Sequence, residues 1–308
     1  MEIKVHDPNE FPSLLNKLNG NVRLINVYCI LKFHNDGCYV GSTITIRSIN
    51  SRYFGVTLEL LNGENLIVVL QTDSNDRLFV HNATTQMLME VQNTMDKYDE
   101  ILFSSLAPSI APALYAHFDS TTTHPFMPMN ERALMFYADK EQRQKLTETQ
   151  LQLPDGFEFV ELPVDAAKAI CEEVVALKSK NQERIIASKI EHYPAIGIRH
   201  AASGELATYA TNDGTGLISN IYTRPKFRRL GFAKLIEQKL AQINLETHGL
   251  WPFKGVGLNR PRVIAMTKNL YLWSVVPNGE VENEPNDLAY HWIARTKTHQ
   301  EPIVFLEN

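Results

Sequence analysis

The spacing of apolar residues predicts strands followed by helices over the first 150 residues. Short runs rich in β-branched and aromatic residues are typical of strands, and apolar residues that recur every three or four positions are typical of helices. The expected strands are Val22–Leu31, Cys38–Arg47, Val56–Leu61, Leu66–Thr72 and Arg77–Val80. The expected helices are Phe11–Leu18, Thr85–Met95, Tyr98–Phe118 and Asn130–Leu146. This order, with a turn at Asn62-Gly63, indicates an α+β layer.

A polar segment from Thr147 to Asp155 separates this region from the rest of the chain and predicts a linker. We therefore expect two domains, of residues 1–150 and 151–308, since a chain of 308 residues is long enough for two cores. No catalytic constellation stands out in the first domain. Its histidines His81, His117 and His124 are far apart in sequence, so we expect surface or hydrogen-bonded side chains.

The second region alternates strands and helices. The expected strands are Phe157–Leu162, Ile196–His200, Glu205–Thr211, Leu217–Thr223, Lys254–Leu258, Trp273–Val276 and Ala289–Arg295. The expected helices begin near Asp165, Gln182, Gly231 and Arg262. The first of these helices has one apolar face, made by Ala167, Ile170, Val174 and Leu177. The three successive strands between Ile196 and Thr223 should form an antiparallel meander.

The stretch from Thr215 to Ile243 organises this second region. It contains a predicted strand, a basic turn and a helix whose apolar positions share one face: Phe232, Ile236, Leu240 and Ile243. The helix leads to the strand Lys254–Leu258. A crossover of this strand–helix–strand kind makes its two strands parallel neighbours.

Positive charge concentrates at the start of this helix, at Arg224, Lys226, Arg228, Arg229 and Lys234. The whole chain has 30 Lys and Arg against 35 Asp and Glu, a net charge of −5. Without these five cations the balance would be 25 − 35 = −10. A negative chain with so local a basic cluster argues against general nucleic-acid binding.

A helix start of this composition predicts a phosphate or pyrophosphate site. The first backbone N–H groups of a helix lack intrahelical partners and lie at the positive end of its dipole. Small residues at Gly231 and Ala233 let an anion approach the backbone closely, and arginine donors match phosphate geometry. The alternative is an ordinary amphipathic helix with a solvated basic N-terminus.

The hexapeptide Arg228-Arg229-Leu230-Gly231-Phe232-Ala233 fits Arg/Gln-x-x-Gly-x-Gly/Ala, the pyrophosphate loop of GNAT-superfamily acyltransferases. From roughly Leu153 to Val276 the chain resembles the glycine N-acyltransferase branch of that superfamily, in the segments LPDGFEF, KSKNQERIIASKIEHYPA, YTRPKFRRLG and MTKNLYLWSVVP. The resemblance implies a GNAT fold, with a mixed, splayed central sheet and flanking helices. An N-terminal α+β domain would precede it and shape the acceptor pocket.

The resemblance also implies a reaction. Acyl-CoA or acetyl-CoA would be the co-substrate, without a metal, and the acceptor would be a small amine, glycine first among amino acids. By motif position, the backbone of Ile221, Tyr222 and Thr223 would bind the pantetheine arm, and Arg228 to Ala233 would hold the pyrophosphate. Tyr271 would protonate or orient the departing thiolate, or else pack as a core tyrosine.

The sequence departs from the resembled family at the catalytic base. The family's glutamate would fall at Leu217, so no strong base projects from that position. Ser219, two residues along the same strand face, is a water-holding substitute. Asp213 is an alternative, although Asp-Gly in a hairpin turn is more often structural. Without a carboxylate base, the pH–rate profile should lack an acidic limb.

Two rival functions stay open. One is a GNAT acetyltransferase that acts on a protein N-terminus, a lysine or a polyamine. The acidic run Glu280–Asp287 would then be the candidate acceptor groove, unless it is a solvated loop. The other is a CoA-binding protein that has lost its base and has no turnover.

The cysteines and the N-terminal sequence bear on the compartment. Three cysteines without metal-type spacing suit a reducing compartment. The first residues, MEIKVHDPNEF, have neither the apolar run of a signal peptide nor the Arg and Ser bias of a transit peptide. No apolar run approaches the roughly 20 residues of a membrane span. We expect a cytoplasmic or mitochondrial protein that is not secreted.

Overall fold

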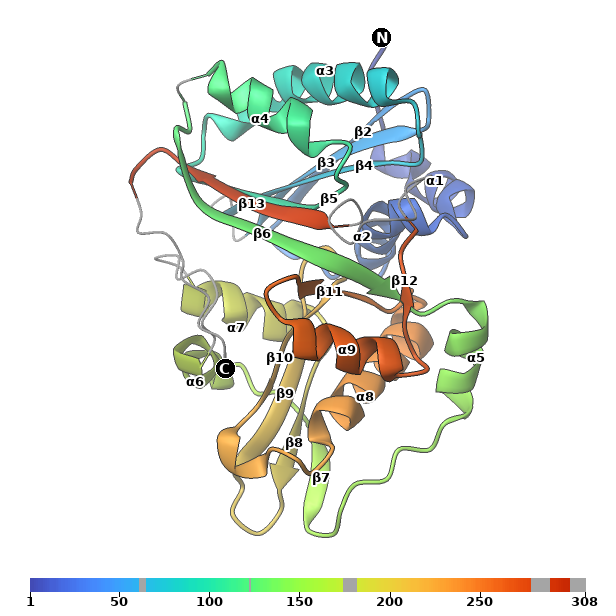
Figure 1. Cartoon of the computed structure of the whole chain (residues 1–308), viewed down its shortest axis with the longest axis vertical. Coiled ribbons are helices and arrows are strands. Elements are labelled where there is room, and N and C mark those ends of the chain that lie inside the picture. Colours follow the sequence, from blue (N-terminus) through green and yellow to red (C-terminus); the bar gives the residue numbers. More distant parts are fainter. Residues whose placement is uncertain (61–64, 122, 174–181, 278–288, 300–308) are drawn as a thin grey trace. The chain divides into compact units, whose positions relative to one another are not determined.

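The computed structural model describes residues 1–60, 65–121, 123–173, 182–277 and 289–299. The chain, drawn in Figure 1, forms two compact units that interleave along the sequence. Unit 1 comprises Met1–Met135, Val256–Ala265 and the chain from Val275 onward, and unit 2 comprises Phe136–Gly255 and Met266–Ser274. The strand Phe253–Gly257 and the helix Pro261–Asn269 therefore run from one unit into the other.

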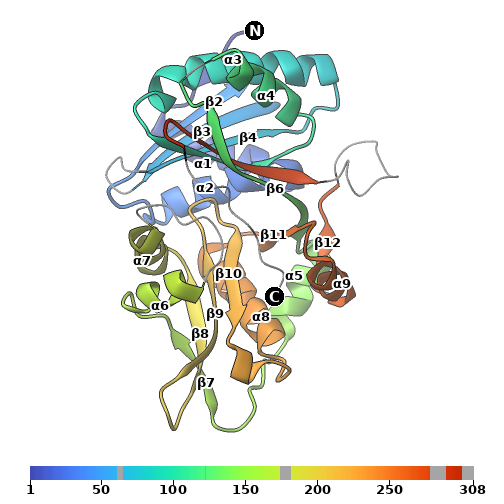
Figure 2. The same cartoon turned by 60° about the vertical axis from the view of Figure 1, so that its left-hand side comes forward.

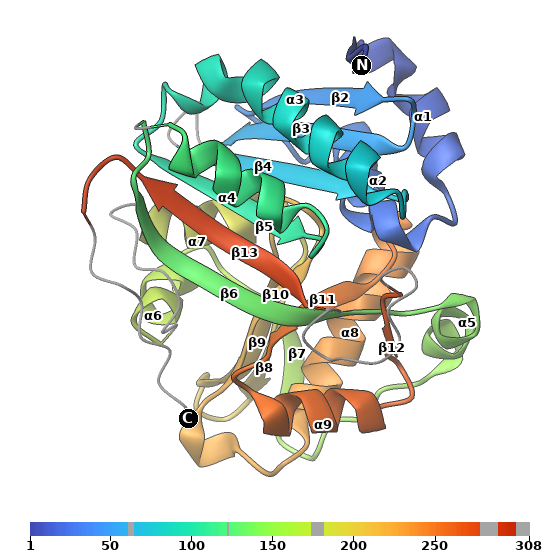
Figure 3. The ribbon, with the colours of Figure 1, turned by 45° about the horizontal axis from the view of Figure 1, so that its top comes forward.

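Unit 1 is built on a mixed sheet in the order β1-β2-β3-β4-β5-β13-β6, in which β4 and β5 are parallel. Its strands are β1 Lys4–Val5, β2 Thr43–Ile49, β3 Tyr53–Leu60, β4 Asn65–Thr72, β5 Glu100–Leu106, β6 Phe126–Tyr137 and β13 Tyr290–Thr296. Its helices are α1 Phe11–Leu18, α2 Ile25–Asn35, α3 Arg77–Met95 and α4 Ala111–Asp119. Helices α3 and α4 cover one face and α1 and α2 the other (Figure 2), and Figure 3 shows β13 between β5 and β6.

The helix Phe11–Leu18 and the strand Leu66–Thr72 are confirmed, but the expected strand Val22–Leu31 is wrong. It is a short 3-10 turn, Val22–Leu24, followed by α2. Every residue from Ile25 to Leu31 is buried. Because no polar face interrupts this run, its sequence carries no helical period to distinguish it from a buried strand.

The expected strand Arg77–Val80 is also wrong, because these residues form the first turn of α3. The helix start is fixed by Asp76, whose side chain accepts a hydrogen bond from the backbone N–H of Phe79. An aspartate at this position is a strong N-cap signal. The expected helix Thr85–Met95 is therefore the second half of a longer helix.

Two expected helices each begin with a strand. Tyr98–Phe118 contains β5 and then the shorter α4, and Asn130–Leu146 contains the end of β6 and then α5 (Lys140–Glu148). Five of the seven residues of β5 are buried, and a continuous apolar run does not distinguish a buried strand from a helix. The strand expected at Cys38–Arg47 begins later, as β2.

The elements expected beyond the linker are confirmed, but the last of them, the strand expected at Ala289–Arg295, is β13 and belongs to unit 1. The strands of unit 2 are β7 Phe157–Glu161, β8 Ala195–His200, β9 Leu206–Asn212, β10 Ile218–Thr223 and β11 Phe253–Gly257, and β12 is Ser274–Val275. Its helices are α5, α6 Ala166–Glu173, α7 Gln182–His192, α8 Phe232–His248 and the end of α9, Pro261–Asn269. Strands β8, β9 and β10 form the antiparallel meander, and β10 and β11 are parallel.

The sheet of unit 2 has helices on both faces. Helix α8 packs against β8, β9 and β10, whereas α6 and α7 pack around Tyr209 of β9 through Ile170 and Ile186. Some expectations for the chain lie outside the described residues: the turn Asn62-Gly63, the helix positions Val174 and Leu177, and the acidic run Glu280–Asp287.

The two units repeat one order of elements. In each, a strand is followed by two helices, a three-stranded antiparallel meander, a helix, a strand parallel to the last strand of the meander, and another helix. Strand β4, helix α3 and strand β5 of unit 1 thus correspond to β10, α8 and β11 of unit 2. This correspondence allows the two crossovers to be compared directly.

Two further expectations concern membranes and cysteines. Among the helices of the described segments, none is both long and apolar enough to cross a membrane. None of the three cysteines is in a disulfide; Cys29 is buried, and Cys38 and Cys171 are half-buried.

The boundary near residue 150 stays a prediction about independent folding. We expect a protease of broad specificity to cut the folded chain first between Gln150 and Pro154, where the backbone lies outside helices and strands. Mass spectrometry of the fragments would map the cut. Early cleavage confined to Phe157–Val276 would contradict this boundary.

Candidate functional site

The parallel strands β10 and β11 meet at one point and then part. In the described residues, Ile218 of β10 and Lys254 of β11 are the one pair of residues that lie opposite each other in this parallel ladder. Strand β10 remains paired with β9 as far as Thr223, opposite Thr208. The edge of β10 that faces away from β9 therefore loses its neighbouring strand after Ile218. This confirms the splayed sheet expected from the resemblance.

Strand β10 is irregular where it leaves β11. Its register against β9 shifts between Ser219 and Tyr222, and Asn220 has a left-handed backbone with φ of 50°. The Asn220 side chain donates a 3.1 Å hydrogen bond to Oγ1 of Thr211, which steadies this uncommon conformation. A bulge of this kind turns backbone groups away from the regular ladder.

The turn after β10 leaves a row of backbone donors open. Arg229 and Gly231 both have left-handed backbones, with φ of 68° and 80°, and α8 then begins at Phe232 without a side-chain cap. Within the described part of the chain, no hydrogen bond uses the backbone N–H groups from Arg229 to Ala233. A Cβ added to Gly231 would meet no atom of a more distant residue within 4 Å, so no other segment packs against this glycine.

The basic charge at this turn is smaller than the sequence suggests. Arg224 pairs with Glu173 at 2.7 Å, and Lys226 pairs with Glu205. Arg228 donates a 3.2 Å hydrogen bond to the carbonyl oxygen of Thr223 and lies over the ring of Tyr222. Three exposed cations thus remain for an anion: Arg228, and also Arg229 and Lys234, for which no ion pair with a described residue occurs.

A buried ion pair ties α8 to β11. Nζ of Lys254 lies 2.5 Å from Oε1 of Glu237, and the indole N–H of Trp273 donates to the same oxygen. All three side chains are buried. Burial lowers the pKa of Lys254, and the Glu237 carboxylate opposes this effect. Because Lys254 lies opposite Ile218, the pair fixes α8 to the point where the strands part.

The expected substitutes for a catalytic base have structural partners. Leu217 is only 8% exposed. Asp213 accepts hydrogen bonds from the backbone N–H groups of Thr215 and Leu217 and from the Thr215 hydroxyl, as a turn residue does. The hydroxyl of Ser219 donates to the carbonyl oxygen of Thr211 at 3.3 Å.

Tyr271 lies in a different setting from Ser219. Its side chain is 43% exposed, and its hydroxyl accepts a 3.1 Å hydrogen bond from Gln238 of α8. The Thr149 hydroxyl lies 3.3 Å from the same oxygen. Tyr271 and Thr149, together with Lys145 and Glu148, line a shallow hollow of about 420 Å³. No contact in the described residues brings Tyr271 and Ser219 together.

The corresponding crossover of unit 1 is closed. Strands β4 and β5 are registered at four positions, so they do not part as β10 and β11 do. The start of α3 is capped by the side chain of Asp76, where α8 has Gly231 and no side-chain cap. An acidic cap both satisfies the helix donors and repels an anion.

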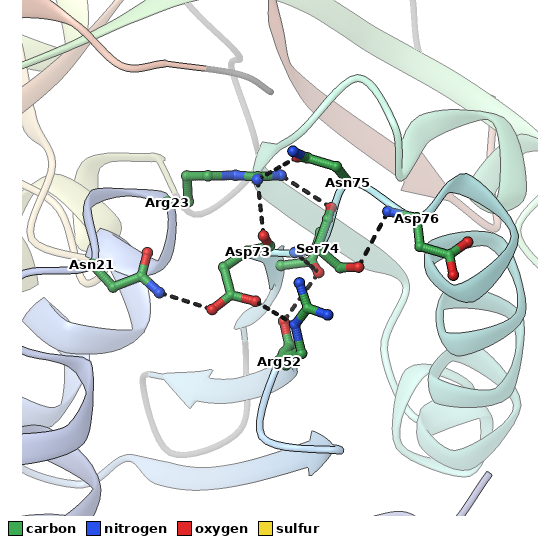
Figure 4. A network of polar contacts seen from close by, with 8 residues as sticks. Asn21, Arg23, Arg52, Asp73, Ser74, Asn75 and Asp76 are labelled. Carbon is green, nitrogen blue, oxygen red and sulfur yellow. Dashed lines mark hydrogen bonds and ion pairs between the residues drawn. The ribbon is translucent and has the colours of Figure 1, made fainter. Parts of the chain in front are cut away.

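Arg23 fills the turn that leads into α3 (Figure 4). Its guanidinium donates hydrogen bonds to the carbonyl oxygens of Asp73 and Ser74 and to Oδ1 of Asn75, at 2.7 to 3.1 Å. Arg52 pairs with the Asp73 carboxylate at 3.3 Å. Arg23 and Arg52 are therefore both engaged by protein oxygens, and the exposed Arg77 at the start of α3 directly follows the acidic cap Asp76.

Comparisons with known proteins identify the fold. The FR47-like protein family model matches residues 195–270. An X-ray structure of a Drosophila protein, a structural genomics target, is 12% identical over 96% of this chain and 98% of its own, with a TM-score of 0.70. A tandem GNAT protein from the clavulanic acid biosynthesis pathway, solved without AcCoA, is 11% identical over 97% of this chain and 100% of its own, with a TM-score of 0.50. No match was found among curated proteins.

The chain has the GNAT fold, in the tandem arrangement that its two repeated units indicate. The matched segment 195–270 begins with β8 and ends just beyond α9, so it contains the parted strands and the basic turn. The FR47-like match covers the segment that carries the basic turn, and the whole chain shares the fold of GNAT proteins. Identities of 11% and 12% carry the fold alone and not a branch within the superfamily.

The basic turn yields a binding prediction. Arg228→Glu together with Arg229→Glu should weaken CoA binding about 100-fold or more, since two charge-assisted contacts of about 1.5 kcal/mol each become repulsive. Isothermal titration calorimetry with CoA would measure the change. The matched control is Arg199→Glu with Lys239→Glu, which alters the net charge of unit 2 equally at β8 and α8. An unchanged dissociation constant in a folded double variant would refute the assignment.

The buried ion pair yields a stability prediction. Glu237→Gln keeps an acceptor for Trp273 but leaves Lys254 buried without a counter-charge. The free energy of unfolding should fall by about 3–5 kcal/mol. Adding Lys254→Met removes the stranded charge and should restore much of that loss. Urea unfolding would compare the two variants; a double variant no more stable than Glu237→Gln would show that the pair is not what holds α8.

Proposed function

We propose that this protein transfers an acyl group from acyl-CoA to the amine of a small acceptor, with an amino acid such as glycine as the first candidate. One observation carries the proposal: an uncapped helix start with open backbone donors and a left-handed Gly231 follows directly on a strand that has parted from its parallel neighbour. A pyrophosphate fits the first feature and an extended amide chain fits the second.

The pantetheine arm would lie along the free edge of β10. Its two amide groups resemble a peptide, so they can pair with the backbone of Ile221, Tyr222 and Thr223 as a missing strand would. The pyrophosphate would then meet the N–H groups of Gly231, Phe232 and Ala233, with Arg228 and Arg229 as flanking cations. Leu230 would contribute its backbone, because its exposed side chain is apolar.

Acyl transfer from a thioester requires few further groups from the protein. A thioester is already activated, so a neutral amine held near its carbonyl carbon can attack directly. The carbonyl oxygen gains negative charge in the transition state, and a backbone N–H at the irregular segment of β10 is suited to stabilise it. As the C–N bond forms and the C–S bond breaks, the amine loses a proton and the thiolate of CoA gains one.

For Tyr271 and Ser219 we propose the catalytic roles that the sequence suggests. Tyr271 would assist the departing thiolate through a hydroxyl that Gln238 and Thr149 already orient. Ser219 would hold a water near the reacting amine, although its hydroxyl also bonds Thr211. The buried Leu217 favours a second candidate function, a CoA-binding protein without turnover, because it leaves β10 without a base.

A screen of thiol release tests the proposal. Acetyl-CoA and longer acyl-CoAs would each be offered with amino acids, alkylamines, polyamines and a lysine peptide, and the freed thiol measured. Release that depends on an amino acid supports the proposed reaction. Release with the lysine peptide or polyamine alone would support another GNAT acceptor class. CoA binding without release from any pair would leave the binding protein as the function.

Tyr271→Phe distinguishes a catalytic tyrosine from a packing one. If the hydroxyl assists thiolate departure, kcat should fall by about 10-fold or more while KM stays nearly constant, since the interaction grows only in the transition state. A packing role predicts instead a loss of about 1 kcal/mol of stability, from the stranded donor of Gln238, with kcat unchanged. Steady-state kinetics and urea unfolding of the same variant would separate the two results.

A further inference from the structure

Unit 1 contains a half-buried carboxylate that no described residue satisfies. Glu131 lies on β6 and forms neither a hydrogen bond nor an ion pair with the described part of the chain. Burial raises the pKa of its carboxyl, and the charge of Arg260 opposes the shift. A half-buried carboxylate to which no described residue donates can accept hydrogen bonds from a ligand that reaches it.

Gly257 and Asn259 lie directly against this carboxylate. A Cβ atom added to Gly257 would lie 2.5 Å from Oε1 of Glu131 and 2.5 Å from Oδ1 of Asn259. The carboxylate and amide oxygens therefore face the same small space, which any larger residue at position 257 would fill. Two acceptors side by side are suited to a group with several donors, such as an ammonium.

Trp292 faces Glu131 from the neighbouring strand. The two residues are register partners in the antiparallel pair of β6 and β13, so their side chains project from the same face. On the other edge of β13, the register with β5 shifts between His291 and Ile293, which places Trp292 at a bulge. Bulges re-aim side chains, and an aromatic face beside a carboxylate favours a cation.

Arg260 places a positive charge near the carboxylate of Glu131. It is exposed, and its charge acts on Glu131 although the two form no ion pair. Among the described residues, Arg260 is the one charged group that acts on the pKa of Glu131. A carboxylate and a guanidinium held near each other but unpaired suit the two ends of a zwitterion. Gly257 also ends β11, three residues beyond Lys254 on the same strand.

We propose that Glu131, Asn259 and Trp292 bind the ammonium of an amino acid, and that Arg260 binds its carboxylate. Gly257 provides the space. The role of this amino acid as acyl acceptor rests on the proposed function, whereas its binding does not require turnover. Glu131 must be ionised to hold an ammonium, so binding should strengthen as pH rises through its raised pKa and weaken as pH falls below it.

Indole signals provide a direct test. The chain has three tryptophans, and Trp292→Phe would identify the Trp292 signal in the NMR spectrum of protein labelled with 15N-tryptophan. Glycine, alanine, glutamine and phenylalanine would each be titrated. We expect at least one to shift the Trp292 signal and leave those of Trp251 and Trp273 in place. Failure of all four to shift it at 50 mM would overturn the proposal.

Two variants assign the charged groups. Glu131→Gln should weaken amino-acid binding at least 10-fold and abolish its pH dependence, whereas Glu90→Gln on α3 should change neither. Arg260→Gln should weaken the binding of the amino acid but not of ethylamine, which lacks a carboxylate. Unperturbed Trp251 and Trp273 signals would show that the variants are folded. Unchanged binding in folded Glu131→Gln would contradict the assignment.

The NMR titration and the kinetic assay distinguish failure of the amino-acid site from failure of the transfer reaction. A Trp292 shift without acyl transfer to any amine would keep the amino-acid site and reject the transfer reaction. Acyl transfer to an amino acid with an unchanged KM in Glu131→Gln would keep the reaction and reject this site as the place where the acceptor binds.

Discussion

The proposed CoA site depends on one constraint, the parting of β10 from β11 immediately after Ile218. Parallel strands joined by a helix normally satisfy their backbone groups along a shared edge, as β4 and β5 do over four registered positions. In unit 2 the pairing is registered at one position, where Lys254 is also anchored to Glu237 of α8. The helix is thereby held in place while the strands diverge. The backbone edge that this exposes needs a partner, and an extended amide chain provides one.

The comparison of the two units shows how the same order of elements gives an open turn in one and a closed turn in the other. Before α8, a left-handed Gly231 and an uncapped helix start leave backbone donors free beside arginine side chains. Before α3, Asp76 caps the helix and Arg23 is bound to oxygens of the turn itself. The open turn before α8 and the closed turn before α3 differ in a few residues, although the order of elements around them is the same. This difference between the two turns is the physical reason to propose that CoA binds unit 2.

Local patterns in the sequence predict the part of this site that local interactions build. The apolar spacing of α8, the glycine at 231 and the arginines around it are all contained in one short stretch, so the strand, turn and helix are confirmed there. Helix α2 and strand β5 are different, because burial on all sides removes the periodicity that distinguishes helix from strand. Their structure is decided by packing against distant segments.

The unpredicted features of the site depend on contacts between distant residues. Glu173 and Glu205 neutralise two of the five cations at the turn, and neither acid is near them in sequence. The cluster around Glu131 requires the register of β6 against β13, whose residues are about 160 positions apart, and the close approach of Gly257. At position 217, where the glutamate of the resembled family would fall, a buried leucine stands, and which group takes the proton of the amine stays a prediction.

Hydrogen–deuterium exchange with and without CoA tests the proposed CoA site of unit 2, because it locates the ligand on the chain without a mutation. Millimolar CoA should slow backbone exchange in peptides that cover Ile218 to Leu235, and exchange at Asp73 to Val80 should not change. Slower exchange at Asp73 to Val80, or no change from Ile218 to Leu235, would contradict the proposed site.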